Sequence, residues 1–435
     1  MALDAAGLDG NRLPMPGPRA WRTQGESKMR MRIRPLVFGM ALAAIVASCS
    51  PAESGAGSTG TDASVETGSD ASGETPDDGD TAASDEVIAA IDARLAELVG
   101  NVDYRDQNGV EASGFEATEL SEDQVQQIRD MGLKAGIAMH STSDAWSFEL
   151  IAGLKEQFED LGIQVVGTTD AENDPGTQTT QIETLLASGP DIIVSLPTNP
   201  MAMVDAFRKA QQAGVTLVFT TITPEGFVGG EDYVAMVSDD RFASGLISGY
   251  QLAKAIGGKG KVALIYHDAD NYTTEQSWLG AKEALSEFPE IEVFERGIIG
   301  PDFGGDAQAA MNGLLTQHPD LAGAWGVWDF PAEGIMAAAR AAGRLDLKVT
   351  TIGFGENVAI ALAKNELIVG LSAIDARSEG RALARLGALE VLGVEDLPVF
   401  VASAPVEVNH GNVLDAWQAV YSVDAPDSVA SAYVE

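Results

Sequence analysis

The chain has 435 residues, of which 65 are acidic and 27 are basic, so its formal net charge is −38 at pH 7. A negative field of this size repels nucleic acid, and we expect no nucleic-acid partner. Cys49 is the only cysteine, which excludes internal disulfides and cysteine-based metal or redox sites. We therefore expect neither a metal nor a cofactor.

The first feature along the chain is a signal of the lipoprotein type. Basic residues between Lys28 and Arg34 precede an apolar run from Leu36 to Ala47, and Ser48-Cys49 follows. The run is too short to span a bilayer, which needs about 20 residues, and its flanks are typical of a secretory signal. The order Val-Ala-Ser-Cys resembles the lipobox. We predict an N-terminal extension and signal peptide over residues 1–48, with Cys49 as the lipidation site. The alternative is an ordinary signal peptide followed by an incidental cysteine.

Residues 49–84 have the composition of a spacer. From Ser50 to Ser84 the chain is mainly Ser, Thr, Gly, Ala, Asp and Glu, without Lys, Arg or an aromatic residue. Such a segment buries too little apolar surface to offset its ordering entropy, so we predict a disordered acidic stalk. Residues 85–132 follow as a helical N-terminal addition, with a helix start at Ser121-Glu122-Asp123. We expect this addition to pack on the first lobe of the folded body.

From Leu133 onward, short β-rich runs alternate with amphipathic stretches. The predicted strands are 133–138, 163–167, 191–196, 215–220, 233–237, 261–266, 291–295, 324–327, 348–353 and 371–374. Between the first two strands, apolar residues recur at helical spacing from Phe148 to Leu161, and Gly162 ends the helix. Repeated strand–helix units predict an α/β fold with two doubly wound parallel-sheet lobes.

Polar and aromatic side chains follow these strands, where open parallel sheets bind ligands. They include His140, Asp144, Trp146, Asn199, Ser238, Asp239, Asp240, His267, Trp328, Asp329, Phe354 and Asp375. Carboxylates and amides bond to hydroxyl groups, and aromatic faces pack on the C–H side of a sugar ring, so we expect a cleft for a polyhydroxylated molecule. The plain alternatives are helix N-caps for Asp144 and Asp240, and a core position for Trp328.

Several short motifs carry a family resemblance. They are Gly136-Ile137-Ala138 with Asp144-Ala145-Trp146-Ser147, Gln181-Ile182-Glu183-Thr184-Leu185-Leu186 with Pro190-Asp191-Ile192-Ile193-Val194, Gly257-Gly258-Lys259-Gly260-Lys261-Val262, Trp328-Asp329-Phe330-Pro331-Ala332-Glu333-Gly334 and Thr351-Ile352-Gly353-Phe354. In this order and spacing, the segment from Leu133 to about Tyr421 resembles the type 1 periplasmic-binding-protein fold, of the ribose- and galactose-binding kind that serves ABC sugar importers.

The strand ends and the family's binding positions together define the candidate ligand-binding residues. They are His140, Asp144, Trp146, Asn199, Asp239, His267, Ser277, Phe303, Trp328, Asp329, Phe354 and Asp375. Three positions depart from the family pattern: Trp328 stands where an amide is usual, Gly355 stands where a carboxylate is usual, and Ser277 stands where an arginine is usual. The resemblance implies a carbohydrate or polyol ligand without naming it.

The resemblance also implies how the chain is divided and how it works. The expected N-lobe is 133–237 plus 375–403, and the expected C-lobe is 238–374 plus 404–435, with crossovers near Val237–Asp239, Ala373–Asp375 and Ala402–Val406. A lipid-anchored, extracytoplasmic monomer would close on its ligand and deliver it to ABC permease subunits. No nucleophile elbow, P-loop or metalloprotease motif occurs, so we expect no catalytic residue and no enzyme. The alternative is a ligand-sensing receptor that feeds a membrane kinase or chemoreceptor.

Overall fold

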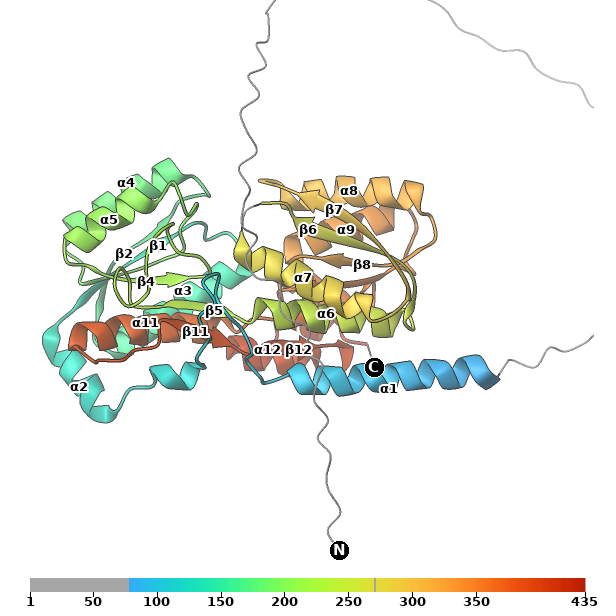
Figure 1. Ribbon diagram of the computed structural model, residues 1–435, viewed down its shortest axis with the longest axis horizontal. Coiled ribbons are helices and arrows are strands. Elements are labelled where there is room, and N and C mark those ends of the chain that lie inside the picture. Colours follow the sequence, from blue (N-terminus) through green and yellow to red (C-terminus); the bar gives the residue numbers. More distant parts are fainter. Residues whose placement is uncertain (1–77, 270, 435) are drawn as a thin grey trace, which may run out of the picture. The chain divides into compact units, whose positions relative to one another are not determined.

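The computed structural model describes residues 78–269 and 271–434, which form two six-stranded sheets (Figure 1). The strands of the first sheet, in order, are β11 (Phe400–Ser403), β5 (Met236–Asp239), β4 (Thr216–Thr220), β3 (Ile192–Ser195), β1 (Lys134–Met139) and β2 (Gln164–Asp170). All neighbouring strands in this sheet run parallel. The sheet with its covering helices is called the first lobe below.

The second sheet belongs to the second lobe. Its strands, in order, are β12 (Val406–Val408), β10 (Ile368–Ala373), β9 (Lys348–Ile352), β8 (Leu321–Gly326), β6 (Lys259–His267) and β7 (Glu290–Ile298). Only the β10–β12 pair is antiparallel. Each of the ten predicted strands overlaps an observed strand. The short strands β11 and β12 were not predicted.

Helices cover both faces of each sheet, as Figure 1 shows. In the first lobe, α3 (Ala145–Asp160) and α11 (Ala376–Leu392) pack together on one face, and α4 (Pro175–Ala187) and α5 (Val204–Gln212) cover the other. In the second lobe, α6 (Arg241–Ala255) and α7 (Tyr272–Ser286) lie opposite α8 (Phe303–Gln317), α9 (Asp329–Ala341) and α10 (Glu356–Ala363). This arrangement confirms the predicted two-lobed α/β class.

The chain passes between the two sheets at three places in the described residues. It leaves β5 at Asp239 for α6, leaves β10 at Ala373 for α11, and leaves β11 at Ser403 for β12. These passages coincide with the three crossovers that the family resemblance implies. Several of the binding candidates lie on these segments, so the crossovers also form part of the candidate site.

The N-terminal addition contacts both lobes. Helix α1 (Asp78–Leu98) begins inside the segment predicted as a stalk, and it packs on α6 of the second lobe, where its Ile91 and Leu95 are buried beside Tyr250. The expectation that the whole addition packs on the first lobe was therefore wrong for α1. The reason is that Ile91 and Leu95, one helical turn apart, find their apolar partner surface on α6.

The later part of the addition, from Ser113 onward, lies on the first lobe. Ser113 exchanges backbone hydrogen bonds with β11, donating to Phe400 O at 3.0 Å and accepting from Ala402 N at 2.9 Å. The 3-10 helix η1 (Phe115–Thr118) and helix α2 (Glu122–Met131) then contact α11. Ser121 caps α2 with a complete capping box, which confirms the predicted helix start.

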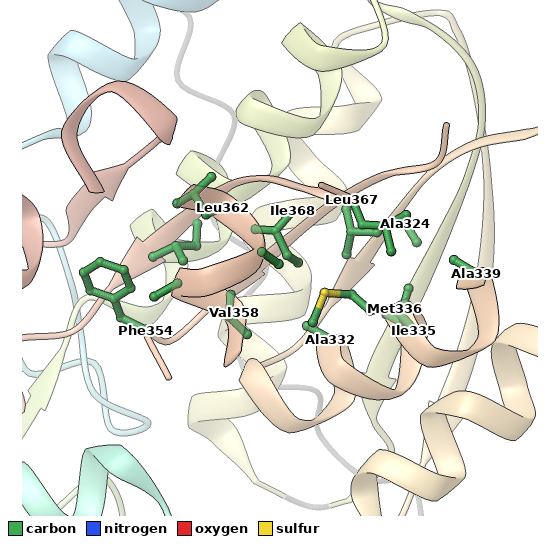
Figure 2. Packing of buried hydrophobic residues seen from close by; sticks show 14 of the residues in the cluster. Ala324, Ala332, Ile335, Met336, Ala339, Phe354, Val358, Leu362, Leu367 and Ile368 are labelled. Carbon is green, nitrogen blue, oxygen red and sulfur yellow. The ribbon is translucent and has the colours of Figure 1, made fainter. Parts of the chain in front are cut away.

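The core of the second lobe is built from small and branched side chains between the sheet and helices α8, α9 and α10. Figure 2 shows part of it, with Ile335 and Met336 of α9 opposite Val358 and Leu362 of α10. Phe354 lies at one end of this cluster and is 3% exposed. Burial of such side chains is the main favourable term in folding. No helix in the described part of the chain is long and apolar enough to cross a membrane.

Candidate functional site

The first lobe contributes an aromatic and acidic wall at the end of β1. His140 and Trp146 meet edge to face with ring centroids 6.5 Å apart. Trp146 packs against the buried cores of both lobes, which places it between them. Burial lowers the pKa of His140, which favours the neutral imidazole.

The second lobe contributes three aromatic rings from three different strand ends. His267 follows β6, Phe303 begins α8 after β7, and Trp328 follows β8. The ring centroids of Phe303 and Trp328 are 4.8 Å apart, and His267 lies 5.4 Å and 5.5 Å from them. Burial lowers the pKa of His267 as well. All three side chains are partly exposed, so they present aromatic surface beyond the strand ends.

Asp329 is the acidic group of the second-lobe wall. It is the first residue of α9, and its Oδ1 accepts a hydrogen bond from Phe330 N at 3.1 Å. Its Oδ2 lies against Gly355, where an added Cβ would be only 2.5 Å away. Desolvation and the negative charge of Asp144, on the other lobe, raise the pKa of Asp329 to about 7. The site therefore holds an acid that keeps its proton to a higher pH than an ordinary aspartate does.

A charged group lies at the crossovers, at the base of both walls. Arg241 Nε and Asp239 Oδ1 form an ion pair of 2.6 Å. Trp146 Nε1 donates to Glu379 Oε2 at 3.2 Å. Glu379 is completely buried, and desolvation followed by the charge of Asp239 raises its pKa. We use "interlobe site" for the two walls together with Asp239, Arg241 and Glu379.

Arg241 and Glu379 were not among the predicted residues. Arg241 follows Asp239-Asp240 directly, so its position just after a predicted strand was a usable signal. Glu379 had no such signal, because it lies in the first turn of α11 and its partners are distant in the sequence, with Trp146 lying 233 positions earlier.

Two of the predicted aspartates act as helix N-caps. Asp144 Oδ1 accepts from Ser147 N at 2.7 Å and Asp375 Oδ1 accepts from Ser378 N at 3.0 Å. Asp240, for which a cap was the plain alternative, accepts from Ala243 N at 2.9 Å. These bonds satisfy backbone donors at the starts of α3, α11 and α6. The carboxylates of Asp144 and Asp375 still contribute negative charge, because Asp144 acts on Asp329 and Asp375 acts on Glu379.

The structure does not bring all predicted residues to the interlobe site. Ser277 is 1% exposed in the contact between α6 and α7, and its hydroxyl donates to Thr273 O. Phe354 is buried against Trp417 and Tyr421 of α12 (Val413–Tyr421). Both side chains therefore pack inside the second lobe in this structure. Asn199 is exposed after β3, and its Oδ1 accepts from Met201 N and Ala202 N at 3.0 and 2.8 Å.

The chemistry of the interlobe site is that of binding. Aromatic faces and hydrogen-bonding groups surround it, which suits an organic ligand with polar substituents. Among the described residues, no group of three or more His, Cys, Asp or Glu side chains is arranged to hold a metal ion.

Comparison with known proteins identifies the family. A family described as periplasmic binding protein domain matches residues 135–393, more than half of the chain. The D-apiose import binding protein of Paraburkholderia graminis is 27% identical over 199 residues, which are 45% of this chain and 62% of that protein. The ribose import binding protein RbsB of Salmonella typhimurium is 26% identical over 46% of this chain and 65% of its own length. The chain thus aligns with somewhat less than two thirds of these relatives, which are named as binding proteins rather than enzymes.

Solved structures support the fold. An ABC transporter solute binding protein from Agrobacterium vitis, bound with α-D-tagatopyranose, has a TM-score of 0.60 at 24% identity and covers 68% of this chain and 100% of its own. A second protein from Agrobacterium vitis, with bound allitol, has a TM-score of 0.58 at 22% identity and covers 66% of this chain and 99% of its own. The two-lobed body is therefore the part that is shared. The chain belongs to the periplasmic binding protein domain family, with the type 1 fold of the substrate-binding proteins of sugar ABC transporters.

Proposed function

We propose that the protein binds a sugar or polyol at the interlobe site, outside the cytoplasm, and delivers it to an ABC importer. The single observation that carries this proposal is the position of Trp146, which packs against the cores of both lobes and bonds to Glu379 at the crossovers. A ligand stacked on this ring would contact both lobes. The relatives support the ligand class, since they are named for apiose and ribose import.

Ligand binding would be coupled to lobe closure. A ligand that touches both walls interacts more strongly with the closed arrangement than with the open one, so it shifts the population toward the closed form. The three crossovers are short, from Asp239 to Arg241, from Ala373 to Ala376 and from Ser403 to Val406, and they are the segments that would bend. The closed protein would present both lobes to the permease.

The proposal is tested by replacing Trp146 with alanine. Aromatic packing and the link to Glu379 are both lost, so affinity for the bound sugar or polyol should fall at least about tenfold. The ligand is first found by a thermal-shift screen of sugars and sugar alcohols, and the dissociation constants of both proteins are then measured by calorimetry.

Phe148→Ala is the matched control. Phe148 lies two residues further along α3, about 200° around the helix from Trp146, and it is 65% exposed. Its removal should leave affinity unchanged. An unchanged dissociation constant for Trp146→Ala would remove this ring from the binding site.

Membrane attachment is proposed through Cys49, which lies outside the described residues. Lipidation of this thiol would anchor the protein at the membrane surface. Cys49→Ala should release the protein from the membrane fraction and abolish incorporation of labelled fatty acid. Continued membrane association and labelling of the variant would contradict the lipid anchor without affecting the ligand proposal.

A further inference from the structure

The N-terminal addition is attached to a different lobe at each of its ends. Helix α1 packs on α6 of the second lobe through Ile91 and Leu95. Ser113 exchanges backbone hydrogen bonds with β11 of the first lobe. Figure 1 shows the same division, with α1 beside the second lobe and α2 beside the first. Residues 99–112, called the strap below, therefore connect the two lobes.

The strap contacts the first crossover and the start of α7. Asp103 N donates to Asp240 Oδ2 at 3.2 Å, and Asp240 lies between β5 and α6. The ring of Tyr104 is stacked on that of Tyr272, the first residue of α7. Tyr272 Oη donates to Arg105 O at 3.0 Å. The strap therefore binds the first turn of a second-lobe helix.

The first lobe binds the same turn of α7 directly. Thr273 Oγ1 donates to Thr221 O at 2.9 Å, and Thr221 follows β4 of the first lobe. Thr273 is 2% exposed, so its hydroxyl is shielded from water. Tyr272 also packs against the buried first-lobe cluster that contains Phe219 and Phe400. The start of α7 therefore contacts both the strap and the first lobe.

These contacts occur in an arrangement that brings the two walls of the interlobe site together. The negative charge of Asp144 on the first lobe acts on Asp329 on the second. If the lobes rotate apart about the crossovers, Thr273 moves away from Thr221, and a hydrogen bond weakens steeply once its geometry is lost. In the open arrangement the freed polar groups bond to water, so each contact stabilises the closed arrangement by the net value of one hydrogen bond.

We propose that the start of α7 is a clasp: Thr273 binds it to the first lobe and Tyr272 binds it to the strap, so that the lobes stay together without a ligand. A ligand then enters a cleft that is already near its bound arrangement, and less of its binding free energy is used in closing the lobes. This inference goes beyond the proposed function, because it concerns the conformation of the ligand-free protein.

The clasp is tested by measuring the distance between the lobes in the ligand-free protein. Cys49 is the only cysteine, so the full chain with Cys49→Ala accepts spin labels at two introduced cysteines. Met201→Cys after β3 and Ile299→Cys after β7 place one label on each lobe, at side chains that are 71% and 69% exposed. Double electron–electron resonance should give a distribution dominated by the shorter interlobe distance.

Tyr272→Phe combined with Thr273→Val removes both hydroxyl donors and keeps the shapes of the side chains. The ratio of the long-distance to the short-distance population should rise about tenfold, because two hydrogen bonds of the closed arrangement are lost. Thr316→Val is the matched control. Its Oγ1 donates to Asn312 O at 2.8 Å within α8 of the same lobe, so this variant should leave the ratio unchanged.

Three results would overturn the clasp. They are an unchanged ratio in the double variant, an equal rise in Thr316→Val, and a distribution dominated by the longer distance before the clasp is altered. Urea unfolding verifies that the double variant is folded. If it is not, Tyr272→Phe alone replaces it and should raise the ratio about threefold, and an unchanged ratio there overturns the clasp equally. None of these results bears on the proposed ligand class, because no ligand is present.

Discussion

At the scale of single residues, the interlobe site contains acidic side chains whose surroundings disfavour the charged form. Burial raises the pKa of Asp329 from 3.8 to about 7 and the pKa of Asp240 to about 6, and it raises that of Glu379. Between pH 4 and pH 7, the folded protein therefore binds more protons at these groups than the unfolded chain does. Stability that depends on them is largest at low pH and falls as the pH rises. The loss of stability that follows ionisation of these acids can be offset by a bound ligand.

Asp329→Asn should therefore stabilise the ligand-free protein at pH 8. Asparagine cannot ionise, so the free energy of unfolding at pH 8 should rise by on the order of 2 kcal/mol. This is less than the whole pKa shift would give, because the side chain is partly exposed. At pH 4, where the folded wild type is protonated at this position, the two proteins should differ by less than about 0.5 kcal/mol. Urea denaturation at both pH values measures the difference. The same change at both pH values would contradict the raised pKa.

At the scale of secondary-structure elements, each lobe depends on helix pairs that cross at glycine. A Cβ added at Gly153 of α3 would lie 2.0 Å from Arg377 O of α11, and one at Gly334 of α9 would lie 2.1 Å from Gly304 O of α8. In the α6–α7 pair, a Cβ at Gly280 would lie 2.2 Å from Phe242 O. Backbone atoms at these points approach more closely than any side chain allows. The pairs include α6, α9 and α11, which begin at the interlobe site, so this packing fixes the positions of their first residues.

Gly280→Ala tests this packing. The added methyl group meets backbone atoms, which cannot rotate away, so we expect a loss of about 2–3 kcal/mol from overpacking. Gly313→Ala in α8 is the control, because nothing lies within 4 Å of its added Cβ. Alanine is the better helix former, so this variant should be neutral or more stable by up to about 1 kcal/mol. Similar stabilities of the two variants in denaturant titrations would mean that the α6–α7 crossing tolerates a wider separation.

At the scale of the whole molecule, the N-terminal addition joins the two lobes. Tyr104 is 4% exposed, with ring centroids 6.5 Å from Tyr272 of the second lobe and 5.6 Å from Phe400 of the first. Nearby, Asp103 N donates to Asp240 Oδ2 at 3.2 Å, and Tyr272 donates to Arg105 O at 3.0 Å. This link runs outside the residues 135–393 matched by the family and supplements the three crossovers.

Tyr104→Ala should destabilise both lobes together. Loss of a buried aromatic ring from this position should cost about 3 kcal/mol. Arg105→Ala removes an exposed ion pair with Glu111 and should change stability by less than about 0.5 kcal/mol. Differential scanning calorimetry measures the effect, and destabilisation of both lobes together appears as a single transition at a lower temperature. A change as small as that of Arg105→Ala would show that the addition does not stabilise the body.

The sequence by itself determined the features that are encoded locally. Strand–helix alternation, the cap at Ser121 and ten of the twelve described strands follow from side-chain period and turn residues within short windows. The three crossovers were implied by the family resemblance. The polar and aromatic residues after the strands, including Trp146, Trp328 and Asp329, could be identified because parallel strands bring their carboxyl ends to one edge. The strands β11 and β12 follow each other without a helix between them, so the strand–helix alternation that marked the other strands does not mark these two.

Only the tertiary structure decided what depends on contacts between distant positions. Glu379 lies in the site beside Trp146, which is 233 positions away in the sequence. Ser277 and Phe354 are buried under α6 and α12. Helix α1 packs on the second lobe, although the chain from Ser113 to α2 lies on the first. The physical reason is that burial and charge pairing depend on which residues surround a side chain in the folded protein. Periodicity specifies which face of a helix or strand is apolar, but it does not specify which surface packs against that face.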